Sequence, residues 1–353
     1  MHLQIRPFTV HKQFALTISR GTASASTNVW LILQQDGLEG WGEATPFSVG
    51  RSQTTEGIVA SLEQVAPALA SLTPFDQQAV QQILHEQQMP SAARAALDLA
   101  MHDWIGKRLG VPLWRLWGGD RQRIVPTSVT IGISSPEQAR ARLHHWQQSV
   151  TVRAVKVKLG SPAGTEADQA MLRAILADIS PDVKVSVDAN GGWNTEDAIA
   201  MSHWLADQGV TYIEQPLAHG AEDELPRLYR ESPLPIFVDE SCFTSRAIPK
   251  LGDRVHGINI KLMKSGGLTE AQRMIHTARA HGLQVMFGCY SDSALANTAA
   301  AQLAPFADHL DLDSHLNLKD DPFVGATLEH GCLIPPDQPG LGVRWRPSGD
   351  ALH

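Results

Sequence analysis

The sequence predicts a mixed α/β protein built from a closed eight-stranded barrel and a separate α+β unit. From about residue 124, short β-rich runs alternate with amphipathic helical segments, and eight such runs are present. This alternation implies parallel strands joined by crossover helices, and eight strands fit a barrel better than an open doubly wound sheet, the alternative. The first 50 residues alternate in the antiparallel manner instead. A length of 353 residues also exceeds what one hydrophobic core usually organises.

The first unit should occupy residues 1–120. Period-two alternation predicts strands in LQIRPFTV (3–10), TNVWLILQ (27–34) and GWGEA (40–44), with a turn at QQDG. Apolar residues at spacings of three and four then predict helices over about 54–70, 76–86 and 91–108, and the last helix should end at Gly110. A sheet followed by helices is typical of an α+β unit.

The barrel should occupy residues 121–320. After residue 314 the sequence becomes rich in Gly and Pro, so residues 321–353 are expected to leave the barrel and pack back on the first unit. The eight predicted strands are VPTSVTI (125–131), RAVKVK (153–158), VKVSVD (183–188), TYIEQ (211–215), PIFVDE (235–240), GINIK (257–261), QVMFG (284–288) and HLDLD (309–313).

Composition and charge exclude several classes of function. The net charge of −8 and the pI near 6.0 argue against nucleic acid or an anionic membrane as a partner. No signal-peptide pattern and no run of about 18 apolar residues is seen, which indicates a cytoplasmic protein. The widely spaced Cys242, Cys289 and Cys332 suit buried thiols rather than a zinc site. A small-molecule substrate is therefore expected, and a homo-oligomer is left open.

Charged residues recur where the predicted barrel strands end, the level at which α/β barrels carry their active sites. From the second to the sixth strand, the charged residues at successive strand ends are 22 to 30 residues apart, which is about the length of one strand, helix and loop. Charges at strand ends can simply meet solvent, but an ordered series of carboxylates flanked by lysines points to chemistry. The series is Lys156 with Lys158, Asp188, Glu214, Asp239 with Glu240, Lys261, and Asp311 with Asp313.

The three central carboxylates, Asp188, Glu214 and Asp239, would repel one another unless a cation neutralises them. Hard oxygen ligands select Mg²⁺, with Mn²⁺ as the alternative, and one ion per chain is expected. Such an ion could chelate a substrate carboxylate and stabilise the enediolate formed when the α-proton is removed. Lys158 would act as a base whose pKa Lys156 lowers. Lys261, four strands away, would serve the opposite face, so the two bases permit inversion at the α-carbon.

These strand ends resemble those of the enolase superfamily, in its muconate-lactonizing subgroup. The resemblance implies a modified TIM barrel, (β/α)7β, with an α+β capping domain. It also implies Asp188, Glu214 and Asp239 as metal ligands and Lys158 and Lys261 as the acid/base pair, supported by Lys156, Asn190 and Glu240. Lys264 is expected in a loop and is not the expected base. The matching motifs are GWGEA (40–44), KVK (156–158), VDAN (187–190), IEQP (213–216), FVDES (237–241) and NIKLMKSGG (259–267).

The eighth strand distinguishes among the subgroup's activities. LDLDSHLNL (310–318) resembles the motif with which dipeptide epimerases hold the α-ammonium group of the substrate, and two carboxylates on one strand face form a suitable cation receptor. GCYSDSALA (288–296), with Asp292, also resembles their seventh strand. The resemblance therefore implies a dipeptide epimerase acting by 1,1-proton transfer on L-Ala-D/L-Glu or a related L-Ala-L-Xaa dipeptide, with Asp311, Asp313 and Asp292 contacting the substrate.

Three questions stay open. The loops at 17–27 and 46–57 should select the second residue, and Arg20 could meet a glutamate side chain or be a structural turn residue. A small or hydrophobic second residue is the alternative. An N-acylamino acid racemase or o-succinylbenzoate synthase could use the same lysines, and a silent scaffold is the alternative outside enzymes.

Overall fold

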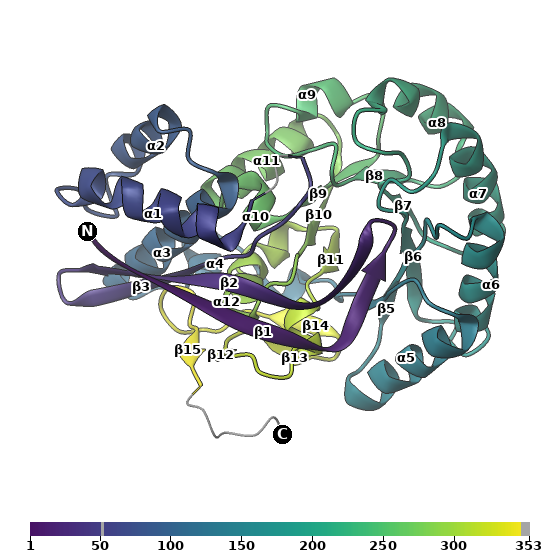
Figure 1. Cartoon of the computed structure of the whole chain (residues 1–353), viewed down its shortest axis with the longest axis horizontal. Coiled ribbons are helices and arrows are strands. Elements are labelled where there is room, and N and C mark those ends of the chain that lie inside the picture. The colour runs from purple at the N-terminus through teal and green to yellow at the C-terminus, as the bar shows by residue number, and fades with distance from the viewer. Residues whose placement is uncertain (51–52, 347–353) are drawn as a thin grey trace.

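The computed structural model describes residues 1–50 and 53–346. Residues 51–52 of the predicted loop at 46–57, and residues 347–353 at the end of the predicted C-terminal segment, lie outside the described residues. Figure 1 shows a ring of helices around a barrel, and a long two-stranded hairpin that reaches from the first unit to the barrel strands. No helix in the described part of the chain is long and apolar enough to cross a membrane.

The first unit carries an antiparallel sheet in the order β1-β2-β3, formed by β1 (His2–Ile18), β2 (Gly21–Gln35) and β3 (Leu38–Ala44). The first two strands are much longer than predicted. The β2 segment before residue 27, GTASAS, is polar and small, so apolar alternation is missing from one side of the hairpin. Pairing nevertheless continues, with one register shift between His11 and Leu16. The hydroxyl groups of Thr17 and Thr22 hydrogen-bond across the strands near the tip.

Three helices follow close to their predicted bounds: α1 (Thr55–Leu69), α2 (Gln77–Glu86) and α3 (Ser91–Leu109). The buried helix α3 packs so closely on β3 that a Cβ atom at Gly42 would lie 1.9 Å from the carbonyl oxygen of Ala96. Glycine is therefore required in the GWGEA segment to bring sheet and helix together. Gly110 adopts a positive φ of 71° and ends α3, as predicted.

The barrel is an eight-stranded parallel sheet in sequential order, and the open doubly wound alternative is wrong. A parallel bridge between Thr127 and Leu310 links its first and last strands, and the Ser128 amide donates to the Leu310 carbonyl (2.9 Å). The strands are β4 (Val129–Ile131), β5 (Ala154–Lys158), β6 (Lys184–Asp188), β7 (Ile213–Glu214), β8 (Ile236–Val238), β9 (Gly257–Ile260), β10 (Gln284–Gly288) and β11 (His309–Asp311).

Helices connect these strands and cover the outside of the barrel, which gives the (β/α)7β arrangement (Figure 1). After β11 the chain enters the short 3₁₀ segment η4 (Ser314–Asn317). The helices after residue 110 are α4 (Leu113–Leu116), α5 (Pro136–Ser149), α6 (Thr165–Leu176), α7 (Thr195–Asp207), α8 (Leu225–Glu231), α9 (Ile248–Leu251), α10 (Leu262–Ser265), α11 (Leu268–Ala280) and α12 (Ala294–Ala301).

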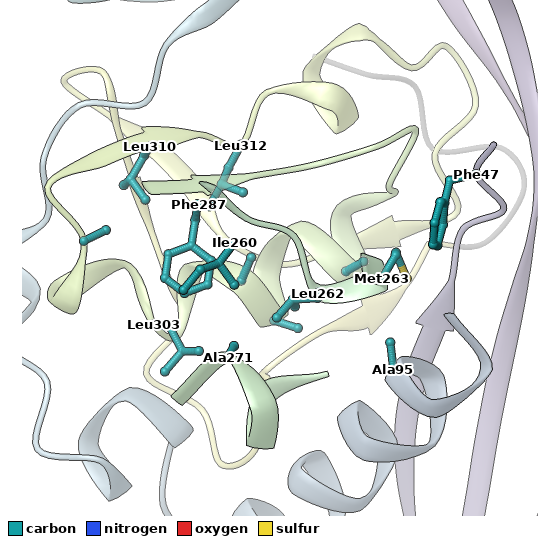
Figure 2. Close-up of a cluster of buried hydrophobic side chains, with 14 of the residues drawn as sticks. Phe47, Ala95, Ile260, Leu262, Met263, Ala271, Phe287, Leu303, Leu310 and Leu312 are labelled. Carbon is teal, nitrogen blue, oxygen red and sulfur yellow. The ribbon is translucent and has the colours of Figure 1, made fainter. Parts of the chain in front are cut away.

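Strand alternation divides apolar from charged side chains. Successive residues of a strand point to opposite faces, so Val155 and Val157 can pack toward the helices while Lys156 and Lys158 enter the barrel. Figure 2 shows part of the apolar layer, in which Phe287 lies beside Ile260, its partner on the neighbouring strand. The apolar layer thus fixes the strands, and the interior is left for polar groups.

The C-terminal segment returns to the first unit in its described part. Trp345 stacks on Trp30 of β2 at 4.8 Å, and the Leu341 amide donates to Asp103 Oδ1 on α3 (2.8 Å). Its strands are β12 (Phe323–Val324), β13 (Thr327–Glu329), β14 (Cys332–Ile334) and β15 (Arg344–Trp345).

Candidate active site

The charged strand ends meet at one level of the barrel. Lys158 is paired in register with Asp188, and Asp188 with Glu214. The side chains of Asp188, Glu214 and Asp239 are almost fully buried, with residue exposures of 0, 0 and 1%. Because these carboxylates come from three neighbouring strands, they form a compact group of negative charge inside the barrel.

A lysine ammonium group contacts each of the three carboxylates. Lys158 Nζ lies 2.6 Å from Asp188 Oδ2, and Lys261 Nζ lies 2.7 Å from Asp239 Oδ2. Lys156 forms an ion pair with Glu214. Lys158 and Lys261 are each 7% exposed, and their strands are four positions apart in the sheet. The two lysines therefore flank the carboxylate group from different sides of the barrel.

The charges perturb one another strongly. Burial raises the pKa of Glu214, and the charge of Asp188 raises it further against the opposing effect of Lys156. Burial lowers the pKa of Lys158, but the attraction of Asp188 outweighs it and the net pKa is raised. Lys156 does act on Lys158 in the lowering direction, but the lowered pKa expected for Lys158 from the sequence is not found in this arrangement. In this arrangement the carboxylate partners of Lys158 and Lys261 hold both lysines as cations.

The carboxylates of Asp188, Glu214 and Asp239 are suitable ligands for a divalent cation, although each contacts a lysine in this structure. Among residues 1–50 and 53–346, no group of three or more His, Cys, Asp and Glu side chains is arranged to hold a metal ion. However, buried carboxylates on adjacent strands are hard oxygen ligands, and the strand ends carry excess negative charge. They contribute six carboxylates (Asp188, Glu214, Asp239, Glu240, Asp311, Asp313) and four ammonium groups (Lys156, Lys158, Lys261, Lys264).

Asp311 and Asp313 line a cavity of about 560 Å³ that Lys158 also borders. Asp311 is already engaged: its carboxylate lies 2.9 Å from Lys156 Nζ and accepts from Ser128 Oγ at 2.6 Å. Burial would raise the pKa of Asp311, but Lys156 and Lys158 outweigh it and lower the pKa to about 2. Asp313 accepts from the backbone N–H of Thr130 (2.6 Å). Burial and the charge of Asp311 raise the pKa of Asp313 to about 6.

Arg20 reaches the barrel from the tip of the β1–β2 hairpin. Its Nη2 lies 2.6 Å from Glu240 Oε1, and its Nη1 donates to the carbonyl oxygen of Asn190 (2.6 Å). Burial raises the pKa of Glu240 to about 7, and Asp239 acts in the same direction, whereas Arg20 opposes it. A second cavity, of about 500 Å³, lies beside these three residues. The guanidinium group therefore has protein partners on both sides.

Comparison with known proteins gives the family. Residues 3–118 match the mandelate racemase / muconate lactonizing enzyme N-terminal domain, and residues 137–349 match the "Enolase C-terminal domain-like" family. The "Hydrophobic dipeptide epimerase" of Flavobacteria bacterium (strain MS024-2A) is 44% identical over 97% of this chain and 98% of its own. The chain belongs to the enolase superfamily.

Two solved structures of this superfamily have nearly the same fold. The dipeptide epimerase of Enterococcus faecalis V583, complexed with Mg and L-Leu-L-Tyr, superposes with a TM-score of 0.90 at 29% identity, covering 97% of this chain and 98% of its own. The dipeptide epimerase of Methylococcus capsulatus, complexed with Mg and L-Arg-D-Lys, gives 0.89 at 30% identity, covering 97% and 98%. The expected superfamily fold is thereby confirmed.

Two further residues of this superfamily member shape the site and were missed in the sequence. Gln215, at a positive φ of 35°, accepts from the Asp239 backbone N–H through Oε1 (2.8 Å). Asn259 Nδ2 donates to Glu214 Oε1 (2.5 Å). They act beside the expected Asn190, which has a φ of 46° and donates through its backbone N–H to Asp188 Oδ1 (2.8 Å). The available signal was their position inside the IEQP and NIK motifs, next to or two residues from the charged Glu214 and Lys261.

Lys264 lies elsewhere than predicted, and the substrate contact expected of Asp292 stays a prediction. Lys264 is not in a loop: it belongs to the short helix α10, is 1% exposed and places Nζ 2.6 Å from Asp239 Oδ1. The helix begins directly after β9, which turns Lys264 back toward the barrel. Asp292 is 5% exposed and accepts from the Tyr290 backbone N–H (3.2 Å), but it is not among the residues that line the two cavities.

Proposed function

We propose that this protein is a Mg²⁺-dependent dipeptide epimerase, an isomerase that inverts the α-carbon of the second residue. Similarity along nearly the whole chain to proteins named dipeptide epimerases supports it. The observation that carries it is the placement of Lys158 and Lys261 on strands four positions apart, on either side of three buried carboxylates. The receptor pair Asp311 and Asp313 opens into the cavity that Lys158 also lines.

Asp188, Glu214 and Asp239 would hold the Mg²⁺ ion. When bound, this ion supplies stabilisation of the negative charge that develops on the substrate carboxylate. The same carboxylates keep Lys158 and Lys261 protonated in the structure, and a protonated lysine cannot accept a proton. Catalysis by these lysines therefore requires that another cation neutralise the carboxylates, which is a second reason to expect a metal requirement.

The lysines then divide the reaction between two faces of the α-carbon. Nζ of one lysine removes the proton, and Nζ of the other delivers a proton to the opposite face, which inverts the configuration. Asp311 and Asp313 hold the α-ammonium group of the first residue and thereby fix the dipeptide between the two bases. Muconate and succinylbenzoate have no cation for these carboxylates, so the pair favours a dipeptide over the substrates of other subgroup members.

The second residue of the dipeptide is proposed to be uncharged. A glutamate side chain would need a cation, but the Arg20 guanidinium is already shared between Glu240 and the Asn190 carbonyl. Using it for the substrate would leave the nearly buried Glu240 without a partner. An uncharged second residue also agrees with the name of the Flavobacteria relative. Of the alternatives that the sequence left open, this one is favoured over L-Ala-D/L-Glu.

The remaining expectations belong to the same proposal. We expect the enzyme to act in the cytoplasm on a free small molecule, with no nucleic acid or membrane partner. The acidic net charge supports the absence of both partners. Cell fractionation checks the location, and sedimentation analysis checks whether the chain forms a homo-oligomer.

A panel of dipeptides tests the function. Free L-Ala-L-Xaa dipeptides are incubated in D₂O with Mg²⁺, and deuterium at the second α-carbon is followed by NMR. Exchange and epimerisation should occur with uncharged second residues and should require the free α-ammonium group. If N-acetyl or N-succinyl amino acids react as readily as free dipeptides, an N-acylamino acid racemase function replaces this one.

A further inference from the structure

The 560 Å³ cavity extends from the proposed ammonium receptor toward the surface, between β1 of the first unit and α5 of the barrel. At its inner end are Asp311, Asp313 and Lys158. Away from that end its walls come from both units and combine apolar with polar side chains such as Gln13 and Gln138. The apolar part, called the apolar wall, includes Phe14, Leu16, Ile133, Ala141 and Trp146.

The cavity lies where the side chain of the first dipeptide residue must begin. The α-carbon that bears the ammonium group also bears that side chain. A receptor at Asp313 that holds the ammonium group therefore also determines where the side chain begins. The second residue has to reach Lys158 and the carboxylates in the opposite direction. The side chain of the first residue is therefore left to enter the space between β1 and α5.

A cationic stack borders the cavity. The Arg142 guanidinium lies 4.0 Å from the ring centre of Phe14 and 4.2 Å from that of Trp146. Its Nη2 donates to Asn317 Oδ1 (3.0 Å), and Asn317 Nδ2 donates to the Phe14 carbonyl (2.8 Å). The stack thus ties the hairpin strand of the first unit to the barrel, above the apolar wall.

The wall carries two cationic side chains, Arg142 and Lys12, and the carboxylate of Asp313 in the receptor is a neighbouring negative charge for both. The Arg142 guanidinium donates to Asn317, and its buried Nη1 has no hydrogen-bond partner among the described residues. Lys12, 6% exposed, also lines the cavity and donates to Ser291 Oγ (2.8 Å). A second cation on the substrate would meet Arg142 and Lys12 there, because Asp311 and Asp313 are taken by the α-ammonium group.

We infer that this cavity binds the side chain of the first residue, that it takes a large apolar side chain, and that it excludes lysine and arginine. The inference rests on the proposed function and adds the substrate class at the first position. The Methylococcus relative was crystallised with a basic first residue, so the exclusion separates this chain from that enzyme. The three extra carbons of leucine over alanine, at ~0.8 kcal/mol each, correspond to roughly fiftyfold in affinity as an upper bound.

Dipeptides that end in glycine test binding apart from inversion, because their second α-carbon is not a stereocentre. Titration calorimetry with Mg²⁺ compares L-Leu-Gly, L-Ala-Gly, L-Glu-Gly and L-Lys-Gly. L-Leu-Gly should bind roughly tenfold to fiftyfold more tightly than L-Ala-Gly, and L-Lys-Gly most weakly. Equal affinities for L-Leu-Gly and L-Ala-Gly, or tightest binding of L-Glu-Gly or L-Lys-Gly, would overturn the inference.

Variants locate the effect in this cavity. Ala141→Phe adds a ring from α5 into the cavity and should remove the preference for leucine over alanine. Gln148→Phe, at an exposed position of α5 outside the cavity lining, is the matched control and should keep the preference. Arg142→Met removes the charge and should raise L-Lys-Gly affinity several-fold. A leucine preference that survives Ala141→Phe would place the side chain elsewhere.

The two proposals fail separately. If no dipeptide exchanges its α-proton but the glycine dipeptides still bind in the expected order, the epimerase function fails and the binding site stands. If exchange proceeds equally well with alanine and leucine as first residue, the function stands and the assignment of the cavity fails.

Discussion

Asp313→Asn removes one charge from the receptor proposed for the α-ammonium group. Asp311 is already bound by Lys156 and Ser128, so Asp313 should supply much of the free attraction for the substrate cation. A charge-assisted hydrogen bond contributes about 1.5–3 kcal/mol, which corresponds to about tenfold to a hundredfold. The amide keeps the size of the side chain and can still accept from the Thr130 backbone N–H. The fold should therefore survive the change.

The assay follows epimerisation of a free dipeptide by NMR and compares KM and kcat for the wild type and the variant. KM should rise by about tenfold to a hundredfold, and kcat should fall as well if the contact positions the α-carbon between the lysines. Asp253→Asn, whose side chain is 87% exposed, is the control and should change neither constant.

The pH dependence gives a second signature. The pKa of Asp313 is raised to about 6, so its carboxylate is ionised above that pH and neutral below it. Binding of the α-ammonium group should weaken as the pH falls through 6, and the bound cation should itself shift this transition to lower pH. In Asp313→Asn, substrate binding should not show this weakening as the pH falls. If KM is unchanged in the variant, or if N-acetylated dipeptide reacts as well as free dipeptide, Asp313 does not hold the ammonium group.

Three further predictions concern the metal, the hairpin tip and the barrel core. Mg²⁺ at a hundredfold excess over its Kd should stabilise the wild type by about 2.7 kcal/mol, measured as a shift in thermal unfolding. Asp239→Asn should lose both this shift and the activity. An equal thermal shift in the variant would show that Asp239 is not a metal ligand. Arg20→Met should lower the free energy of unfolding by about 1–2 kcal/mol, a value discounted for the 39% exposure of the Arg20 side chain. The ratio of the rates on L-Ala-L-Leu and L-Ala-L-Glu should stay unchanged. A changed ratio would mean that Arg20 contacts the substrate. Burial lowers the pKa of His309 to about 4 from an ordinary value near 6.5, so up to about 3 kcal/mol of folding stability present above pH 6.5 is lost as the pH falls toward 4. In chemical unfolding, the stability of His309→Phe should therefore depend less on pH in this range. An identical dependence of stability on pH in the variant and the wild type would contradict the assignment.

The parts of this molecule that follow from local pattern could be predicted from the sequence. Alternation placed the barrel strands, and because parallel strands end at one level, Asp188, Glu214 and Asp239 could be placed together from their positions in the chain alone. Asp311 and Asp313 were expected two apart on one strand; both line the same cavity, but β11 ends at Asp311 and Asp313 follows it. Both cases depend only on the period of a strand and the geometry of a barrel.

Contacts between distant segments could not be predicted in this way. Glu240, which Arg20 meets, lies 220 residues away, and no period in the sequence links the two. The hairpin tip is polar, and its length is set by pairing and by contacts with the barrel rather than by alternation. Lys264 was misplaced because a one-turn helix directly after a strand resembles a loop in sequence. The stack of Arg142 between Phe14 and Trp146 likewise exists only once the two units meet.

The central claim is that Lys158 and Lys261 act on opposite faces of one α-carbon in a metal-dependent site. The most direct test is solvent deuterium incorporation into both diastereomers of one dipeptide by the wild type, Lys158→Ala and Lys261→Ala, with Mg²⁺ and with excess chelator. We predict that each variant loses epimerisation, that at least one still exchanges the α-proton of a single diastereomer, and that chelator abolishes all exchange. Normal epimerisation by Lys261→Ala, or full turnover by the wild type in chelator, would contradict this mechanism.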